Sequence, residues 1–139
     1  MKDSILGMLG LMRKASALAI GKENTIEALN SGKARLMLIP NDASEKKRTD
    51  AELLLRGKNT MLVEFPYSSA EIAEAIGVGG CSMLCVTDLG FSDSLLKKLS
   101  EQNPEYAEAY DEMHRRSEKA KRRRQETAKN GKKNQREGE

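Results

Sequence analysis

The chain has 139 residues, a formal net charge of +3 and 38% hydrophobic residues, which suits one domain of roughly 100 residues with an appendage. No apolar run approaches the ~18 residues that span a membrane, so a membrane-spanning helix is excluded. The two cysteines, Cys81 and Cys85, form no Cys-x-x-Cys motif and lie far from the single histidine, His114, so free buried thiols are expected in place of a metal site.

The first predicted element is an amphipathic helix over residues 4–15, with Ser4 as its N-cap. This start superficially resembles a signal peptide, but charged residues interrupt it and no small-residue cleavage site follows. A short extended segment, residues 17–20, leads to a second helix that begins after Gly21 and ends near Ser31, with Ile26 and Leu29 facing inward.

Three apolar runs predict buried strands at residues 36–39, 61–65 and 82–86. Each is followed by a predicted helix: residues 44–56, a helix begun by Ser68 and Ser69, and a helix after residues 87–90. For the helix at 44–56, the cap is either Ser44 with Lys47 or Asp42 with Glu45. Strands that alternate with helices indicate βα units, a largely parallel sheet of three or four strands, and helices on both faces.

The C-terminal part of the chain differs sharply in charge from the rest. Residues 1–113 hold 13 Lys and Arg against 17 Asp and Glu, a net −4, whereas residues 114–139 hold 11 against 4, a net +7. Asn103 and Pro104 begin a helix whose early turns are acidic and later turns basic, which complements the helix dipole. We therefore predict a domain at 1–102, a charged helical extension at 103–124 and a disordered basic tail at 125–139. The tail is either a nucleic-acid-binding arm or a solubilising segment.

Catalytic motifs are absent from the sequence. One histidine in a charged run cannot build a His-based triad, and the glycine-rich loop at residues 77–80 lacks the spacing of nucleotide-binding loops. Asp42 and Asp88 follow predicted strands and could be catalytic carboxylates, but helix capping is the commoner role for such residues. We expect no enzyme activity and no cofactor.

Binding is better supported, because Gly21 opens a polar helix start. First-turn N–H groups have no partner inside a helix, and the dipole makes that end positive, so it suits a phosphate or a base edge. Lys22 can pair with phosphate, and Glu23 and Asn24 can read base edges; an ordinary turn is the alternative. The loop at residues 77–80 could lie beside this helix start. Seven cationic residues could flank such a surface: Arg13, Lys14, Lys33, Arg35, Lys46, Lys47 and Arg48.

Six segments in order, at residues 10–15, 21–25, 31–39, 41–44, 71–77 and 86–91, resemble the L-seven-Ae family of ribosomal proteins, which includes kink-turn RNA binders. The pieces at 41–44 and 86–91 are similar to its small bacterial ribosome-associated members. The resemblance covers about residues 5–100. It implies a three-layer α/β/α sandwich with a small mixed four-stranded sheet that binds structured RNA without catalysis.

In that family the second helix starts with the pattern G-x-N-E-x-x-K and enters the RNA major groove. Gly21 matches the glycine, but Glu23 stands where Asn is usual, Asn24 where Glu is usual and Glu27 where Lys is usual. A carboxylate in place of the lysine affects kink-turn binding more than RNA binding in general. The family's base-contacting loop matches Ile76, Gly77, Val78 and Gly79.

We therefore predict a cytoplasmic, ribosome-associated protein that binds structured, kink-turn-like RNA. The acidic body and Glu27 favour an alternative, a protein-interaction module of the same fold that has lost standard kink-turn binding. The residues expected to contact RNA are Gly21, Lys22, Glu23, Asn24, Glu27, Lys14, Lys47, Ile76, Gly77, Val78, Gly79, Arg122, Arg123 and Arg124.

Overall fold

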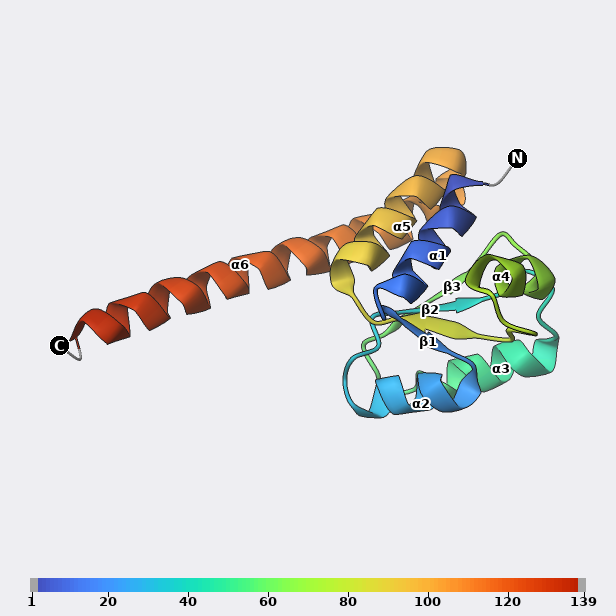
Figure 1. The fold of residues 1–139 in the computed structure, drawn as a ribbon, viewed down its shortest axis with the longest axis horizontal. Helices are drawn as coiled ribbons and strands as arrows, with labels where there is room; N and C mark the ends of the chain where they lie inside the picture. Colours follow the sequence, from blue (N-terminus) through green and yellow to red (C-terminus); the bar gives the residue numbers. More distant parts are fainter. Residues whose placement is uncertain (1–2, 138–139) are drawn as a thin grey trace.

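The computed structural model describes residues 3–137, and its centre is a four-stranded mixed sheet (Figure 1). The strands are β1 (Leu18–Ile20), β2 (Leu36–Ile39), β3 (Met61–Glu64) and β4 (Leu84–Val86), in the spatial order β1-β4-β2-β3. β2 and β3 are parallel, whereas β4 runs antiparallel to both β1 and β2. The sheet is thus mixed, as the family resemblance implied.

The expectation of a largely parallel sheet, drawn from the alternation of strands and helices, is wrong. A parallel strand needs a crossover that returns the chain to the end of the sheet where the preceding strand began. Here the chain leaves β3, forms α4 (Ser69–Ile76) and then enters β4 at the end of the sheet where β1 finishes, since Leu84 pairs with Ile20. β4 therefore runs opposite to the other three strands.

Helices cover both faces of the sheet. α2 (Lys22–Asn30) and α3 (Glu45–Leu54) lie on one face, and α1 (Ser4–Lys14), α4 and α5 (Leu89–Gln102) lie on the other (Figure 1). Alternate residues of β2 point to opposite faces: Leu36 and Leu38 pack in the core beneath α1, α4 and α5, while Met37 and Ile39 pack beneath α2 and α3. This arrangement confirms the three-layer α/β/α sandwich.

Short polar side chains fix where the helices begin. Ser44 Oγ accepts from Lys47 N at 3.2 Å, and Ser68 forms a capping box with Glu71. The first helix is capped by Asp3 and not by Ser4, because the Asp3 carboxylate accepts from Ile5 N at 2.8 Å. Such side chains satisfy N–H groups that the first turn leaves unpaired.

The two aspartates considered as catalytic groups have structural partners. Asp88 caps α5 by accepting from Phe91 N at 2.8 Å. Asp42 accepts from Ser69 N at 3.0 Å and so ties the β2–α3 loop to the start of α4. Their positions after strands are explained by these roles.

The two cysteines are free and buried, as expected from their apolar surroundings. Burial raises the pKa of the Cys85 thiol to about 11 and also raises the pKa of Cys81. Within the described residues, no group of three His, Cys, Asp or Glu side chains lies close enough to hold a metal ion. None of the helices in the described part of the chain has the length and apolar character that a membrane crossing requires.

A short 3-10 turn, η1 (Pro104–Tyr106), capped by Asn103, leads into the long helix α6 (Ala107–Glu137). α6 packs on α5 through Met113 and Ser117, which are 0% and 3% exposed. The Tyr106 hydroxyl donates to Glu64 O at 2.7 Å and anchors the turn to the sheet. From residue 121 to 128 every side chain is exposed, and the helix projects away from the body (Figure 1).

A disordered basic tail was predicted for residues 125–139, and this division of the chain stays a prediction. That prediction rested on the lack of apolar residues beyond Gln125, which leaves nothing to bury against a neighbour. The segment is nevertheless rich in Lys, Arg, Gln and Glu, which have high helix propensity, and the structure describes helix as far as Glu137. Residues 138–139 lie outside the described residues.

Candidate nucleic-acid interface

One end of the sheet gathers several helix starts. α2, α3 and α4 begin there, after β1, β2 and β3 respectively, and residues 77–83 enter β4 at the same place; we call it the α2 end of the sheet. The Gly21 N–H donates to Met83 O at 3.0 Å. The start of α2 and the segment leading into β4 are therefore side by side, an arrangement that the sequence only suggested.

The start of α2 is open to a ligand. Gly21 is the N-cap with φ 87° and ψ 168°, and no side chain caps the helix. This φ is one that side chains rarely allow, so the position favours glycine. Lys22, Glu23 and Asn24 are exposed, and the first-turn N–H groups have no acceptor within the helix.

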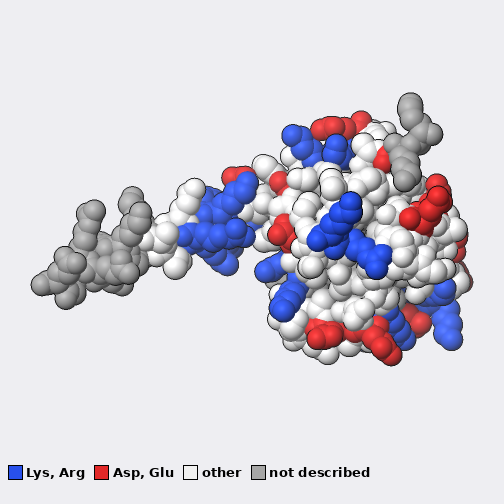
Figure 2. Space-filling view, in the orientation of Figure 1, with Lys and Arg blue, Asp and Glu red and all other residues white. Residues whose placement is uncertain are grey.

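The side chains of α2 make this end less basic than expected. The Asn24 amide nitrogen donates to Ile20 O at 2.8 Å, so its oxygen is the group left to accept from a ligand. Glu23 and Glu27 are exposed and one turn apart, which places both carboxylates on the same face. Figure 2 shows acidic side chains gathered over α2.

The loop after α4 presents only part of its predicted contact residues. Gly77 ends α4 with φ 74°, Val78 is half-buried and Gly79 is exposed. Ile76 is 2% exposed, so its side chain belongs to the core, and its carbonyl accepts a hydrogen bond from Arg13. Gly77, Val78 and Gly79 can therefore meet a ligand, and the Ile76 side chain cannot without rearrangement.

The flanking cations do not gather at one surface. Lys47 is exposed in the first turn of α3, at the α2 end of the sheet. Lys14 ends α1, at the opposite end of β1 from Gly21, and lines a groove between α1 and α4. Arg35 directly precedes β2 and so lies at the other end of the sheet, while Arg48 pairs with Glu64.

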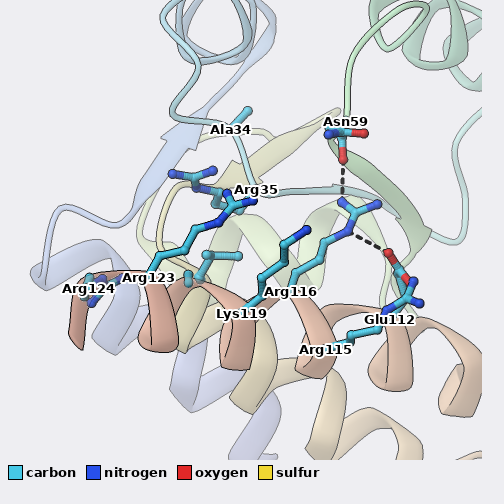
Figure 3. A pocket seen from close by; sticks show the side chains of 11 residues that line it. Ala34, Arg35, Asn59, Glu112, Arg115, Arg116, Lys119, Arg123 and Arg124 are labelled. Carbon is cyan, nitrogen blue, oxygen red and sulfur yellow. Dashed lines mark hydrogen bonds and ion pairs between the residues drawn. The ribbon is translucent and has the colours of Figure 1, made fainter. Parts of the chain in front are cut away.

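A basic surface lies at the end of the sheet where β2 and β3 begin, opposite the α2 end. Arg123 and Arg124 of α6 line a cleft of about 810 Å³ between α6 and the segments that lead into β2 and β3 (Figure 3); we call it the α6 cleft. Arg122, which was grouped with Arg123 and Arg124 as an expected RNA contact, does not line it. Further cationic residues of the cleft, which the sequence pattern did not single out as a site, are Arg115, Arg116 and Lys119.

Comparison with known proteins identifies the fold's family. Residues 3–96 match the ribosomal protein L7Ae/L30e/S12e/Gadd45 family. The chain belongs to this family. The match ends before α6 begins at Ala107, so α6 and its cations lie outside the matched region.

Two similar curated proteins are both named large ribosomal subunit protein eL30. The one from Neurospora crassa is 30% identical over 94 residues, covering 67% of this chain and 86% of that protein. The one from Tetrahymena thermophila is 27% identical over 95 residues, covering 68% and 91%. Both are eukaryotic, so they do not bear out the similarity to small bacterial members.

A solved structure supports the fold. A protein of unknown function from Bacillus halodurans superposes with a TM-score of 0.61 and 23% identity, covering 68% of this chain and 94% of that protein. At this level of identity the likeness concerns the fold alone. It confirms the α/β/α sandwich of the shared domain.

Proposed function

We propose that this protein is a non-catalytic RNA-binding protein associated with the ribosome. The proposal is supported by membership in a family of ribosomal proteins and by relatives named as large-subunit proteins. The observation that carries it is the uncapped start of α2, whose Gly21 is hydrogen-bonded to Met83 in the segment that follows the glycine-rich loop at residues 77–80. Together they form an exposed surface where backbone donors can meet a folded RNA.

The α2 end would recognise structured RNA of the kink-turn type by close backbone approach. The first-turn N–H groups of α2 can donate to phosphate or base edges, and Gly79 leaves room for an extruded base because a Cβ at this position would meet nothing within 4 Å. Lys22 and Lys47 can contact phosphates on either side. The similarity of residues 41–44 and 86–91 to small bacterial ribosome-associated members remains part of this proposal.

A protein-interaction role is the second candidate, and a specific observation favours it. Glu23 and Glu27 place two carboxylates on the exposed face of α2, which repels phosphate. If α2 faces a protein instead, basic residues of that partner would meet these carboxylates.

The substitution Glu27→Lys separates the two candidates. We expect it to strengthen binding to a kink-turn RNA about tenfold, because it replaces a carboxylate facing phosphate with an ammonium group. The measurement is a fluorescence-anisotropy titration of the full chain with a labelled kink-turn RNA. Glu52→Lys is the matched control, since Glu52 is an exposed glutamate near the end of α3 and its replacement alters net charge equally. Equal affinities of wild type and Glu27→Lys would show that α2 does not face the RNA.

A further inference from the structure

The α6 cleft concentrates positive charge at the opposite end of the sheet from Gly21. Its lining includes six cationic side chains: Arg35, Arg115, Arg116, Lys119, Arg123 and Arg124. Among the described residues of the lining, Glu112 is the one carboxylate. Figure 2 shows lysine and arginine side chains clustered around α6 where it leaves the body.

Glu112 neutralises only part of this charge. It accepts from Arg116 at 2.9 Å and also pairs with Arg115, and the hydrogen bond from Arg116 lowers the pKa of Glu112 below its usual value. Within residues 3–128, no ion pair reaches the other four cations, Arg35, Lys119, Arg123 and Arg124. Like charges that converge repel one another, and an anion bound between them removes that cost.

The walls of the cleft are fixed by packing on the body. The buried Met113 and Ser117 hold α6 against α5. Arg116 donates to the carbonyl of Asn59, just before β3, and so ties α6 to the sheet. Figure 3 shows Arg116, Lys119 and Arg123 extending from α6 toward the two segments that carry Arg35 and Asn59. The cations therefore face a defined space and are not spread along a free arm.

The chemistry of the lining favours phosphate groups. Five of the six cations are arginines, whose planar guanidinium groups donate in pairs to phosphate oxygens and remain charged at all physiological pH values. The cleft is elongated along several turns of α6, from Arg115 to Arg124, which suits a run of phosphates better than a single anion. Polymers of phosphodiesters also release counterions on binding.

We propose that the α6 cleft binds the phosphodiester backbone of a second RNA segment. This inference rests on the proposed function in taking RNA as the polyanion. The two sites lie at opposite ends of the strands, and four residues of β2 alone span about 13 Å. The protein therefore bridges two RNA segments, one at the start of α2 and one between α6 and the sheet.

Adjacent arginines of α6 provide the test. Arg123 lines the cleft and Arg122 does not, although both are exposed. We expect Arg123→Glu to weaken binding of the full chain to a labelled RNA duplex of about 12 base pairs by about tenfold, and Arg122→Glu by less than about twofold. Arg35 lies on the opposite wall of the cleft from α6, so Arg35→Glu should weaken duplex binding as much as Arg123→Glu does. If Arg122→Glu and Arg123→Glu weaken duplex binding equally, the α6 cleft is not an RNA-binding site. The RNA would then be attracted only by the overall positive charge of α6.

Photo-crosslinking tests the bridging geometry. A photoreactive residue at position 59 samples the α6 cleft and one at position 23 samples the α2 start. We expect them to crosslink to nucleotides in two separate segments of a structured RNA, whereas crosslinks to the same nucleotides would overturn the bridge. If poly-glutamate displaces the duplex and the affinity for poly-glutamate also depends on Arg123, the cleft does not select RNA. That result would overturn RNA as the ligand of the α6 cleft.

The outcomes separate this inference from the proposed function. If Glu27→Lys changes the affinity for the kink-turn RNA but neither Arg123→Glu nor Arg35→Glu changes the affinity for the duplex, RNA binding by the α6 cleft is overturned. The proposed function would then still stand. If duplex binding depends on Arg123 but Glu27→Lys leaves the affinity for the kink-turn RNA unchanged, the cleft is supported and recognition by α2 is overturned. Absence of RNA binding by the wild-type chain would overturn both.

Discussion

Removal of residues 121–139 is expected to weaken RNA binding about 100-fold near 0.1 M salt and to flatten its salt dependence. This segment holds eight Lys and Arg against three Asp and Glu, and includes Arg123 and Arg124 of the α6 cleft. Each phosphate that the shortened chain no longer neutralises reduces the slope of log affinity against log salt by about 0.7–0.9, so three or four such phosphates reduce it by about 2–4. Titrations at several salt concentrations measure both quantities.

The cut after Ala120 leaves the packing of α6 intact, because Met113 and Ser117 remain in place. The melting curve of the shortened chain should therefore match that of the full chain. This comparison is the control for folding. An unchanged salt slope would show that the basic part of α6 solubilises the protein and does not contact RNA.

Leu9→Ala is expected to lower the free energy of unfolding by about 3–4 kcal/mol. Leu9 is 0% exposed on α1 and packs in the main core, so truncation removes buried methyl groups and leaves a cavity. Chemical denaturation followed by circular dichroism measures the change. The prediction tests whether the N-terminal helix is part of the domain core or only a leader-like segment.

Leu11→Ala provides a control on the same helix. Leu11 is 60% exposed, so the same substitution should change the free energy of unfolding by less than about 0.5 kcal/mol. Similar losses for both variants, or no loss for Leu9→Ala, would contradict the packing of α1 against the sheet.

The layers of the fold were predictable from local patterns. The apolar run at residues 36–39 predicted a strand buried on both faces, and Ser44 and Ser68 marked helix starts that the structure confirms. Strand direction was not predictable from alternation, because it depends on where residues 77–83 re-enter the sheet. On α2 the sequence favoured Ile26 as an inward residue, whereas Thr25 is the one fully buried and its hydroxyl has no hydrogen-bond partner in the described part of the chain.

The candidate site was predictable in part. Gly21 and the loop at 77–80 were identified from the sequence, and the antiparallel pairing of β1 with β4 brings Gly21 beside the segment that follows this loop. The α6 cleft was not predicted, because it joins Arg35 with residues of α6 about 80 positions later in the chain. The pattern that could have indicated the cleft is the spacing of Tyr110, Met113, Ser117 and Ala120 along one face of α6. This face packs on the body and so directs the arginines of α6 toward β2.

Crosslinking of the protein to RNA in cells, with the crosslinked amino acids mapped, tests the central claim most directly. We expect RNA attached at two places, the α2 start with the loop at residues 77–80 and the α6 cleft around Arg35 and Arg123. The crosslinked RNA should be ribosomal. Recovery of the protein without RNA, or with RNA attached only on the α1–α4 face, would contradict this claim.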